Sequence, residues 1–147
     1  MDQQHAPVPE GFDLKAFFAE IRTIAVVGYS DNPERAGHYV AHHLAESGYE
    51  VIAINPKFDG EVNGLRCFPG LDAIPAGTVI DVIDVFRAPP FVPRIVAAAA
   101  ALNPRPGYVV MQPGAESEEA SQLAREHGIV PLDICMMAAH KIWAPDV

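Results

Sequence analysis

Apolar and polar positions along this chain switch repeatedly between two spacings. Short apolar runs, rich in β-branched residues, predict strands at residues 23–27, 50–54, 79–85, 108–111 and 129–132. Segments with helical spacing predict helices at residues 13–21, 34–47, 93–102, 118–127 and 135–142. Regular alternation of strands with helices is typical of an α/β fold.

The runs at 23–27, 50–54 and 108–111 lack polar alternation, which indicates strands buried on both faces of a parallel sheet. We expect a single Rossmann-like, doubly wound sheet of five parallel strands in the order 3-2-1-4-5, with right-handed connections. The helix at 13–21 is extra and packs outside the sheet. Residues 57–78 are expected to be irregular, with brief pairing at most at 65–68.

The chain length and the absence of repeats and linkers predict one domain. The 147 residues suffice for one sizeable core, and no repeat or linker divides them. Two prolines and a glycine in residues 1–12 predict a flexible N-terminal arm, so that residues 13–147 form the domain. Asp13 and Ser117 are placed to cap the helices that follow them.

The charge balance narrows the classes of partner. A formal net charge of −9 argues against a nucleic-acid partner, which needs clustered Lys and Arg. The longest apolar run, residues 95–102, is far shorter than the roughly 20 residues that span a bilayer. The first four residues do not look like a signal peptide, and two cysteines make no disulfide framework. We therefore expect a cytoplasmic protein with neither a membrane nor a nucleic-acid partner.

Polar or special-backbone residues follow every predicted strand. In open α/β sheets, ligands bind outside the carboxyl ends of the strands, where the strand order reverses. Loops must be polar in any case, so the common position on one rim is what favours a site. The strand ends supply Gly28-Tyr29-Ser30, Asn55-Pro56-Lys57, Phe86-Arg87, Gln112-Pro113-Gly114 and Asp133.

The loop after the first predicted strand has features of an anion site. Gly28 lets the backbone turn sharply and approach a ligand, and the start of the next helix offers free N–H groups. A side chain at position 28 is therefore expected to abolish binding and to leave the fold nearly intact. Serine stands where the second glycine of a dinucleotide fingerprint belongs, so a plain strand-to-helix turn explains this loop equally well.

The end of the second predicted strand separates two classes of ligand. A typical NAD site has an Asp or Glu there that accepts from the ribose hydroxyls, whereas this chain has Asn55, Pro56 and Lys57. An amide beside a cation suits a phosphorylated ribose, such as the 3′-phosphate of coenzyme A or the 2′-phosphate of NADP. A solvated surface lysine is an equally good explanation of Lys57.

Several stretches together resemble a known family. They are residues 24–30 (IAVVGYS), 54–56 (INP), 67–69 (CFP), 84–87 (DVFR), 111–114 (MQPG) and 133–135 (DIC). In this order they resemble the small bacterial CoA-binding domain proteins, and the CoA-binding domain of the succinyl-CoA synthetase α subunit, over residues 20–142. The chain departs from the family pattern at Ala139, which precedes His140 in place of an acidic residue.

The resemblance implies a CoA or acyl-CoA site. The residues that it places there are Gly28, Ser30, Arg35, Asn55, Pro56, Lys57, Phe86 and Arg87. The strand-end argument adds Tyr29, Gln112 and Gly114.

No pattern in the chain indicates catalysis. His38 and His42 share a helix face, but a third metal ligand is missing, so surface histidines are the simpler interpretation. Asp81 and Asp84 lie three apart on one strand, so they face opposite sides and make a poor acid–base pair; Asp84 is expected to bind loop amides. We favour a non-catalytic CoA-binding module. The alternatives are a small NADP- or nucleotide-dependent oxidoreductase or transferase, or a partner subunit of one.

Two cysteines and one histidine remain without an assigned role. Cys67 and Cys135 carry neither a CxxC spacing nor flanking basic residues, so inert thiols are favoured over redox-active ones. The role of His140 is open.

Overall fold

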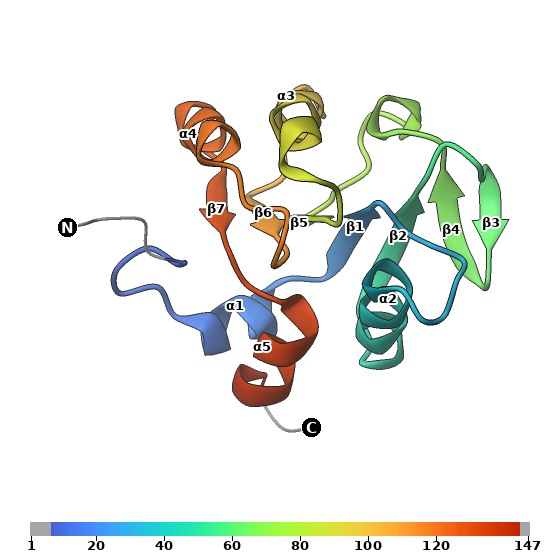
Figure 1. Cartoon of the computed structure of the whole chain (residues 1–147), viewed down its shortest axis with the longest axis horizontal. Helices are drawn as coiled ribbons and strands as arrows, with labels where there is room; N and C mark the ends of the chain where they lie inside the picture. The colour runs from blue at the N-terminus through green and yellow to red at the C-terminus, as the bar shows by residue number, and fades with distance from the viewer. Residues whose placement is uncertain (1–6, 145–147) are drawn as a thin grey trace.

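The computed structural model describes residues 7–144 and contains one mixed sheet covered by helices on both faces (Figure 1). The strands are β1 (Thr23–Val27), β2 (Glu50–Ile54), β3 (Gly60–Val62), β4 (Leu65–Phe68), β5 (Val82–Val85), β6 (Tyr108–Met111) and β7 (Val130–Leu132). The α-helices are α1 (Leu14–Glu20), α2 (Ala36–Glu46), α3 (Val92–Ala100), α4 (Glu118–Glu126) and α5 (Met136–Trp143), with short 3-10 helices η1 (Leu71–Ala73) and η2 (Pro89–Phe91).

The strand order corrects the five-stranded prediction. The sheet runs β3-β4-β2-β1-β5-β6-β7, and every neighbouring pair is parallel except β3 with β4. The strand predicted at 79–85 pairs with β1 on the side away from β2, and not beside β2 as expected. The place beside β2 belongs to β4, so the parallel strands follow the order 3-2-1-4-5-6 of two mononucleotide-binding halves.

The additional strands form a hairpin within residues 57–78, which were expected to be irregular apart from brief pairing at 65–68; β4 confirms that pairing, whereas β3 was not expected. β3 and β4 are only three and four residues long, and they are joined by Asn63-Gly64. Both turn residues have positive φ, 52° and 81°, as a two-residue type I′ turn requires. Asn-Gly between two short runs is therefore the sequence signal that the prediction passed over.

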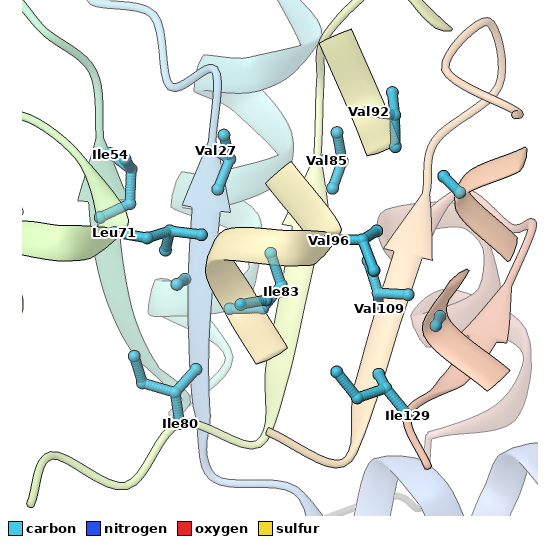
Figure 2. Close-up of a cluster of buried hydrophobic side chains, with 14 of the residues drawn as sticks. Val27, Ile54, Leu71, Ile80, Ile83, Val85, Val92, Val96, Val109 and Ile129 are labelled. Atoms are coloured by element: carbon cyan, nitrogen blue, oxygen red, sulfur yellow. The ribbon is translucent and has the colours of Figure 1, made fainter. Parts of the chain in front are cut away.

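Two buried clusters hold the layers together. One lies between the sheet and helices α3 and α4; its members include Val92 and Val96 on α3 and Ile83 and Val109 on the strands (Figure 2). The other lies on the opposite face, where α1, α2 and α5 pack, and includes Phe17, Leu44 and Met136 (Figure 1). The doubly wound arrangement is thus confirmed.

Side chains cap two of the helices as predicted. Asp13 accepts a hydrogen bond from the Ala16 amide at the start of α1, and Ser117 accepts one from the Ala120 amide at the start of α4. In contrast, the N-cap residue of α2, Arg35, makes no side-chain hydrogen bond to the first turn. The first turn of α2 therefore keeps backbone N–H groups for another partner.

Part of the expected N-terminal arm is packed against the domain. Residues 1–6 lie outside the described residues. The carbonyl of Pro7 accepts from the Asp133 amide, and the Phe12 ring lies 5.8 Å from Phe17 and 6.0 Å from Tyr108, between ring centroids. None of the helices in residues 7–144 is long and apolar enough to cross a membrane.

Candidate functional site

A cavity opens where the strand order reverses, between β1 and β5. It has a volume of about 800 Å³, within the range typical of small-molecule sites. The loops after β1, β2, β5 and β6 line it together with α2, α3 and the segment around η1. Four of the five predicted strand ends therefore meet at this cavity, whereas Asp133, after β7, does not line it.

Ten of the eleven predicted site residues line this cavity. They are Gly28, Tyr29, Ser30, Arg35, Asn55, Pro56, Phe86, Arg87, Gln112 and Gly114. The eleventh, Lys57, is exposed and lies outside the lining.

Gly28 is required by the fold. Its φ is +93°, and a Cβ built on it would lie 2.4 Å from the Phe86 carbonyl oxygen. The glycine therefore lets the end of β1 pass directly against the end of β5. A side chain here would collide with backbone, so our expectation that it would leave the fold nearly intact had the wrong physical basis.

Gly37 has a role that the sequence analysis missed. A Cβ on this residue, in the first turn of α2, would lie 2.5 Å from the Gly28 carbonyl oxygen. In dinucleotide-binding folds the third glycine of the fingerprint permits this kind of helix–strand contact. Here the same contact is made nine residues after Gly28, outside the spacing that we tested.

The Asn55 side chain holds the loop between β1 and α2, residues 28–35, which is called the first loop below. Its Nδ2 donates to the Tyr29 carbonyl at 2.7 Å, and its Oδ1 accepts from the Lys57 amide at 2.8 Å. The amide thus already has one partner at each end, within the protein. This bracing is a second reason for an amide at the end of β2, beside the ribose argument made from the sequence.

Two other lining residues direct their side chains into the protein. Tyr29 is fully buried and its hydroxyl contacts the His42 ring, so the loop offers its backbone to the cavity. Gln112 is 4% exposed, and its Oε1 accepts from the Met136 amide at 3.0 Å. Gln112 therefore ties the loop after β6 to the start of α5.

Charge in the cavity differs in sign from charge on the whole protein. Arg35, Arg87 and Arg94 line it, against Asp72 as the acidic residue of the described lining, while the chain carries a net charge of −9. The Arg87 guanidinium lies 4.3 Å from the centroid of the Phe91 ring, which restrains it beside the cavity. The cavity is therefore suited to an anionic ligand.

The far wall was not predicted. Arg94, Ile95 and Ala98 on α3 line it, together with the segment 69–72 around η1. Ile95 and Ala98 follow the helical period of α3, but the same period also places Val92 and Val96 in the core. Sequence periodicity does not distinguish a wall of the core from a wall of a cavity.

The buried acidic residue of β5 has a different environment from the one expected. Asp84 is fully buried, and neither carboxyl oxygen has a hydrogen-bond partner among the described residues, so it does not bind loop amides. Burial raises the pKa of Asp84 well above its ordinary value. Asp81 holds amides instead: its Oδ2 accepts from the amides of Arg22 and Thr23.

The cysteines and histidines within residues 7–144 do not assemble a metal centre. Cys67 is buried, and burial raises the pKa of its thiol, which disfavours the reactive thiolate. Among residues 7–144, no three His, Cys, Asp or Glu side chains are grouped so that they could hold a metal ion.

Fold and site together define a doubly wound, Rossmann-type domain with an anion-favouring cavity at its switch point. The chain belongs to the CoA-binding domain family, whose model matches residues 22–141. The resemblance noted in the sequence is thus confirmed.

Three relatives illustrate the similarity. YneT of Bacillus subtilis is 33% identical over 135 residues, which cover 91% of this chain and 96% of YneT. A hypothetical protein from Pyrococcus horikoshii OT3 is 31% identical with a TM-score of 0.83, covering 97% of this chain and 99% of that one. An acetyl-coenzyme A synthetase 1 of Ca. Korarchaeum cryptofilum, in complex with phosphate and ADP, is 25% identical with a TM-score of 0.67. It matches 84% of this chain but only 27% of its own.

Proposed function

We propose that this protein binds coenzyme A or an acyl-CoA, without transforming it, in the cavity at the carboxyl ends of β1, β2, β5 and β6. The observation that carries the proposal is the electropositive lining of a cavity in an acidic protein, in a chain of the CoA-binding domain family. Coenzyme A carries a pyrophosphate and a 3′-phosphate, which need such surroundings.

The chain offers two kinds of group to phosphate oxygens. The uncapped first turn of α2 reaches the cavity at Ala36 and Gly37, and its backbone N–H groups and helix dipole favour an anion. Arg35, Arg87 and Arg94 add charged donors, whose hydrogen bonds to phosphate are about twice as strong as neutral ones. The apolar side chains of Ile95 and Ala98 suit the uncharged pantetheine arm.

Asp81 and Asp84 do not supply an acid–base pair to the cavity. Asp84 is fully buried, whereas Asp81 is occupied by backbone amides, and neither lines the cavity. A binding role uses all the features above and requires no further group. NADP is the competing ligand, because its 2′-phosphate would meet the same arginines.

Two neighbouring alanines on α3 allow a matched test. Ala98 lines the cavity, while Ala97 is exposed on the same helix. We expect Ala98→Trp to obstruct the cavity and to weaken CoA binding by at least tenfold in calorimetry. Ala97→Trp adds the same ring to solvent and is expected to bind as the unchanged protein does.

Titrations of both variants and the unchanged protein with CoA, acetyl-CoA and NADP decide the proposal. Equal loss of CoA affinity in both variants would remove the assignment to this cavity. NADP binding more tightly than CoA would replace the proposed ligand. Circular dichroism of each variant confirms that the fold is retained.

A further inference from the structure

A hydrogen-bonded network lies behind the first loop, on the side away from the cavity. It consists of Tyr29 in the loop, His38 and His42 on α2, and Asn63 in the turn between β3 and β4. The Tyr29 hydroxyl lies 2.8 Å from His42 Nε2 and accepts from Asn63 Nδ2 at 2.9 Å. The network thus joins three separate segments of the chain at one buried phenol.

The proton positions follow from these partners. Because Asn63 Nδ2 can only donate, the Tyr29 hydroxyl accepts from it. His38 Nδ1, 3.4 Å from the hydroxyl, carries a proton because it contacts a carbonyl oxygen, so His42 Nε2 is the remaining acceptor for the hydroxyl's own proton. His42 must therefore be neutral, with Nε2 as the acceptor. His38 Nδ1 lies 2.8 Å from the Ser30 carbonyl oxygen, so it must carry a proton and donate to it.

These contacts fix the peptide planes of the loop. His38 holds the Ser30 carbonyl, and Asn55 holds the Tyr29 carbonyl at 2.7 Å. A planar trans peptide directs its N–H opposite to its C=O, so the amides of Ser30 and Asp31 are oriented as well. Ser30 lines the cavity. The network behind the loop therefore sets the direction of donors at its front.

We propose that His42, acting through Tyr29, is a positioning residue for the ligand site, and that its protonation loosens the first loop and weakens CoA binding. This inference rests on the proposed function. A protonated Nε2 would present its own hydrogen to the Tyr29 hydroxyl, which would then lose its acceptor. The two imidazole rings are stacked at 4.2 Å between centroids, so a charge on either disfavours a charge on the other.

The surroundings of His42 keep it neutral at pH 7. Burial lowers the pKa of His42, the neighbouring His38 lowers it further, and the carboxylate of Glu46 on α2 opposes both. Asp31 in the loop and Cys67 on β4 act on Tyr29, where burial is the largest cause of a raised pKa. The phenol thus stays protonated and able to donate across the physiological range.

The expected pH dependence has a definite sign. The pKa of His42 in the folded protein is lowered from the ordinary histidine value of about 6.5. The network is therefore intact above about pH 6.5 and is lost as the pH falls through the lowered pKa of His42. Losing one net hydrogen bond corresponds to roughly a three- to tenfold fall in affinity.

The ligand itself must not titrate in the test. A phosphate monoester has a second pKa near 6, so the 3′-phosphate of CoA adds a pH dependence of its own. Dephospho-CoA lacks this group and is the probe. We expect calorimetry from pH 8 to pH 5.5 to show its affinity falling in the unchanged protein and staying flat in His42→Gln, whose side-chain oxygen accepts without titrating.

Two further variants separate positioning from general damage. Asn63→Gly removes the donor and keeps the positive φ of the turn, so it should weaken binding at pH 8. His127→Gln, at the end of α4 beneath the other face of the sheet, should keep the pH profile of the unchanged protein. The same slope in His42→Gln and in the unchanged protein, or a flat profile in the unchanged protein, would overturn the proposal.

If CoA does not bind at pH 8, the proposed function is rejected. The positioning role of His42 is then tested by a measurement that needs no ligand. In an NMR titration of the unchanged protein, we expect the amide shifts of Ser30 and Asp31 to follow the protonation of His42. If those amides do not respond when the His42 ring titrates, His42 does not position the loop. This experiment also decides the matter if His42→Gln does not fold.

Discussion

Replacing Gly37 by alanine tests whether the contact between α2 and the first loop is as close as the structure shows. Two effects of opposite sign compete. Alanine in a helix is favoured over glycine by about 1 kcal/mol, because glycine loses more backbone freedom on folding. Against this, the new Cβ would lie 2.5 Å from the Gly28 carbonyl oxygen, which belongs to backbone and cannot rotate away.

The steric cost of the new Cβ is expected to exceed the gain in helix propensity. Overpacking of a tight contact typically costs about 1–3 kcal/mol. After the propensity gain, we expect Gly37→Ala to lower the free energy of unfolding by up to about 2 kcal/mol. Because the atom that must move belongs to the cavity-lining loop, CoA affinity should fall as well.

Gly107 provides the matched control. Apart from its chain neighbours, no described residue has an atom within 4 Å of the position of its Cβ, and its φ is not in the left-handed region. Gly107→Ala should therefore be neutral or stabilise by roughly 0.4–1 kcal/mol. Urea denaturation of both variants gives the comparison, and a Gly37→Ala protein more stable than the unchanged one would refute the reasoning.

Three other predictions follow from groups outside the loop. Burial raises the pKa of Asp84, so in the unchanged protein the unfolded state loses this proton at a lower pH than the folded state does. The free energy of unfolding of Asp84→Asn, relative to that of the unchanged protein, should therefore increase as the pH rises from 4 to 7. Denaturation at several pH values measures this, and a constant difference speaks against it. His43 Nε2 and His140 Nδ1 lie 3.0 Å apart between α2 and α5, and burial lowers the pKa of both rings. The protein should therefore lose stability as the pH falls below about 6.5. His140→Gln should make that loss smaller, and the same dependence of unfolding free energy on pH in both proteins would exclude the pair as its source. Finally, the pure protein mixed with acetate, ATP and CoA should form no acetyl-CoA, and product detected by chromatography would show a catalytic role.

The sequence predicted the layers well because they depend on local periodicity. Apolar runs such as 23–27 and 50–54 are β1 and β2, and Asp13 and Ser117 cap the helices that were expected. The strand order was wrong because it depends on pairing between segments distant in sequence. Brief pairing was expected at 65–68, where β4 lies, but so short a run carries too little periodicity to place it in the sheet. Because β4 lies beside β2, β5 pairs with the other side of β1.

The site was predicted at the strand ends and missed elsewhere. Rim residues such as Arg87 follow strands, so their position is fixed by the fold type alone. Gly37 and Arg94 reach the cavity from helices, and only the packing of α2 and α3 places them there. Lys57 lies next to predicted site residues in sequence, but its side chain is exposed outside the lining.

The most direct test of the account compares CoA, dephospho-CoA and NAD as ligands of the unchanged protein and of Arg35→Ala. A charged hydrogen bond to phosphate contributes about 1.5–3 kcal/mol, and exposure of Arg35 reduces this, so we expect roughly a tenfold loss. Arg125→Ala, on α4 and paired with Glu118, is the matched control and should bind normally. Calorimetry should give the affinity order CoA, dephospho-CoA, NAD in the unchanged protein, with a narrower gap between the first two in Arg35→Ala. NAD binding more tightly than CoA would contradict the account.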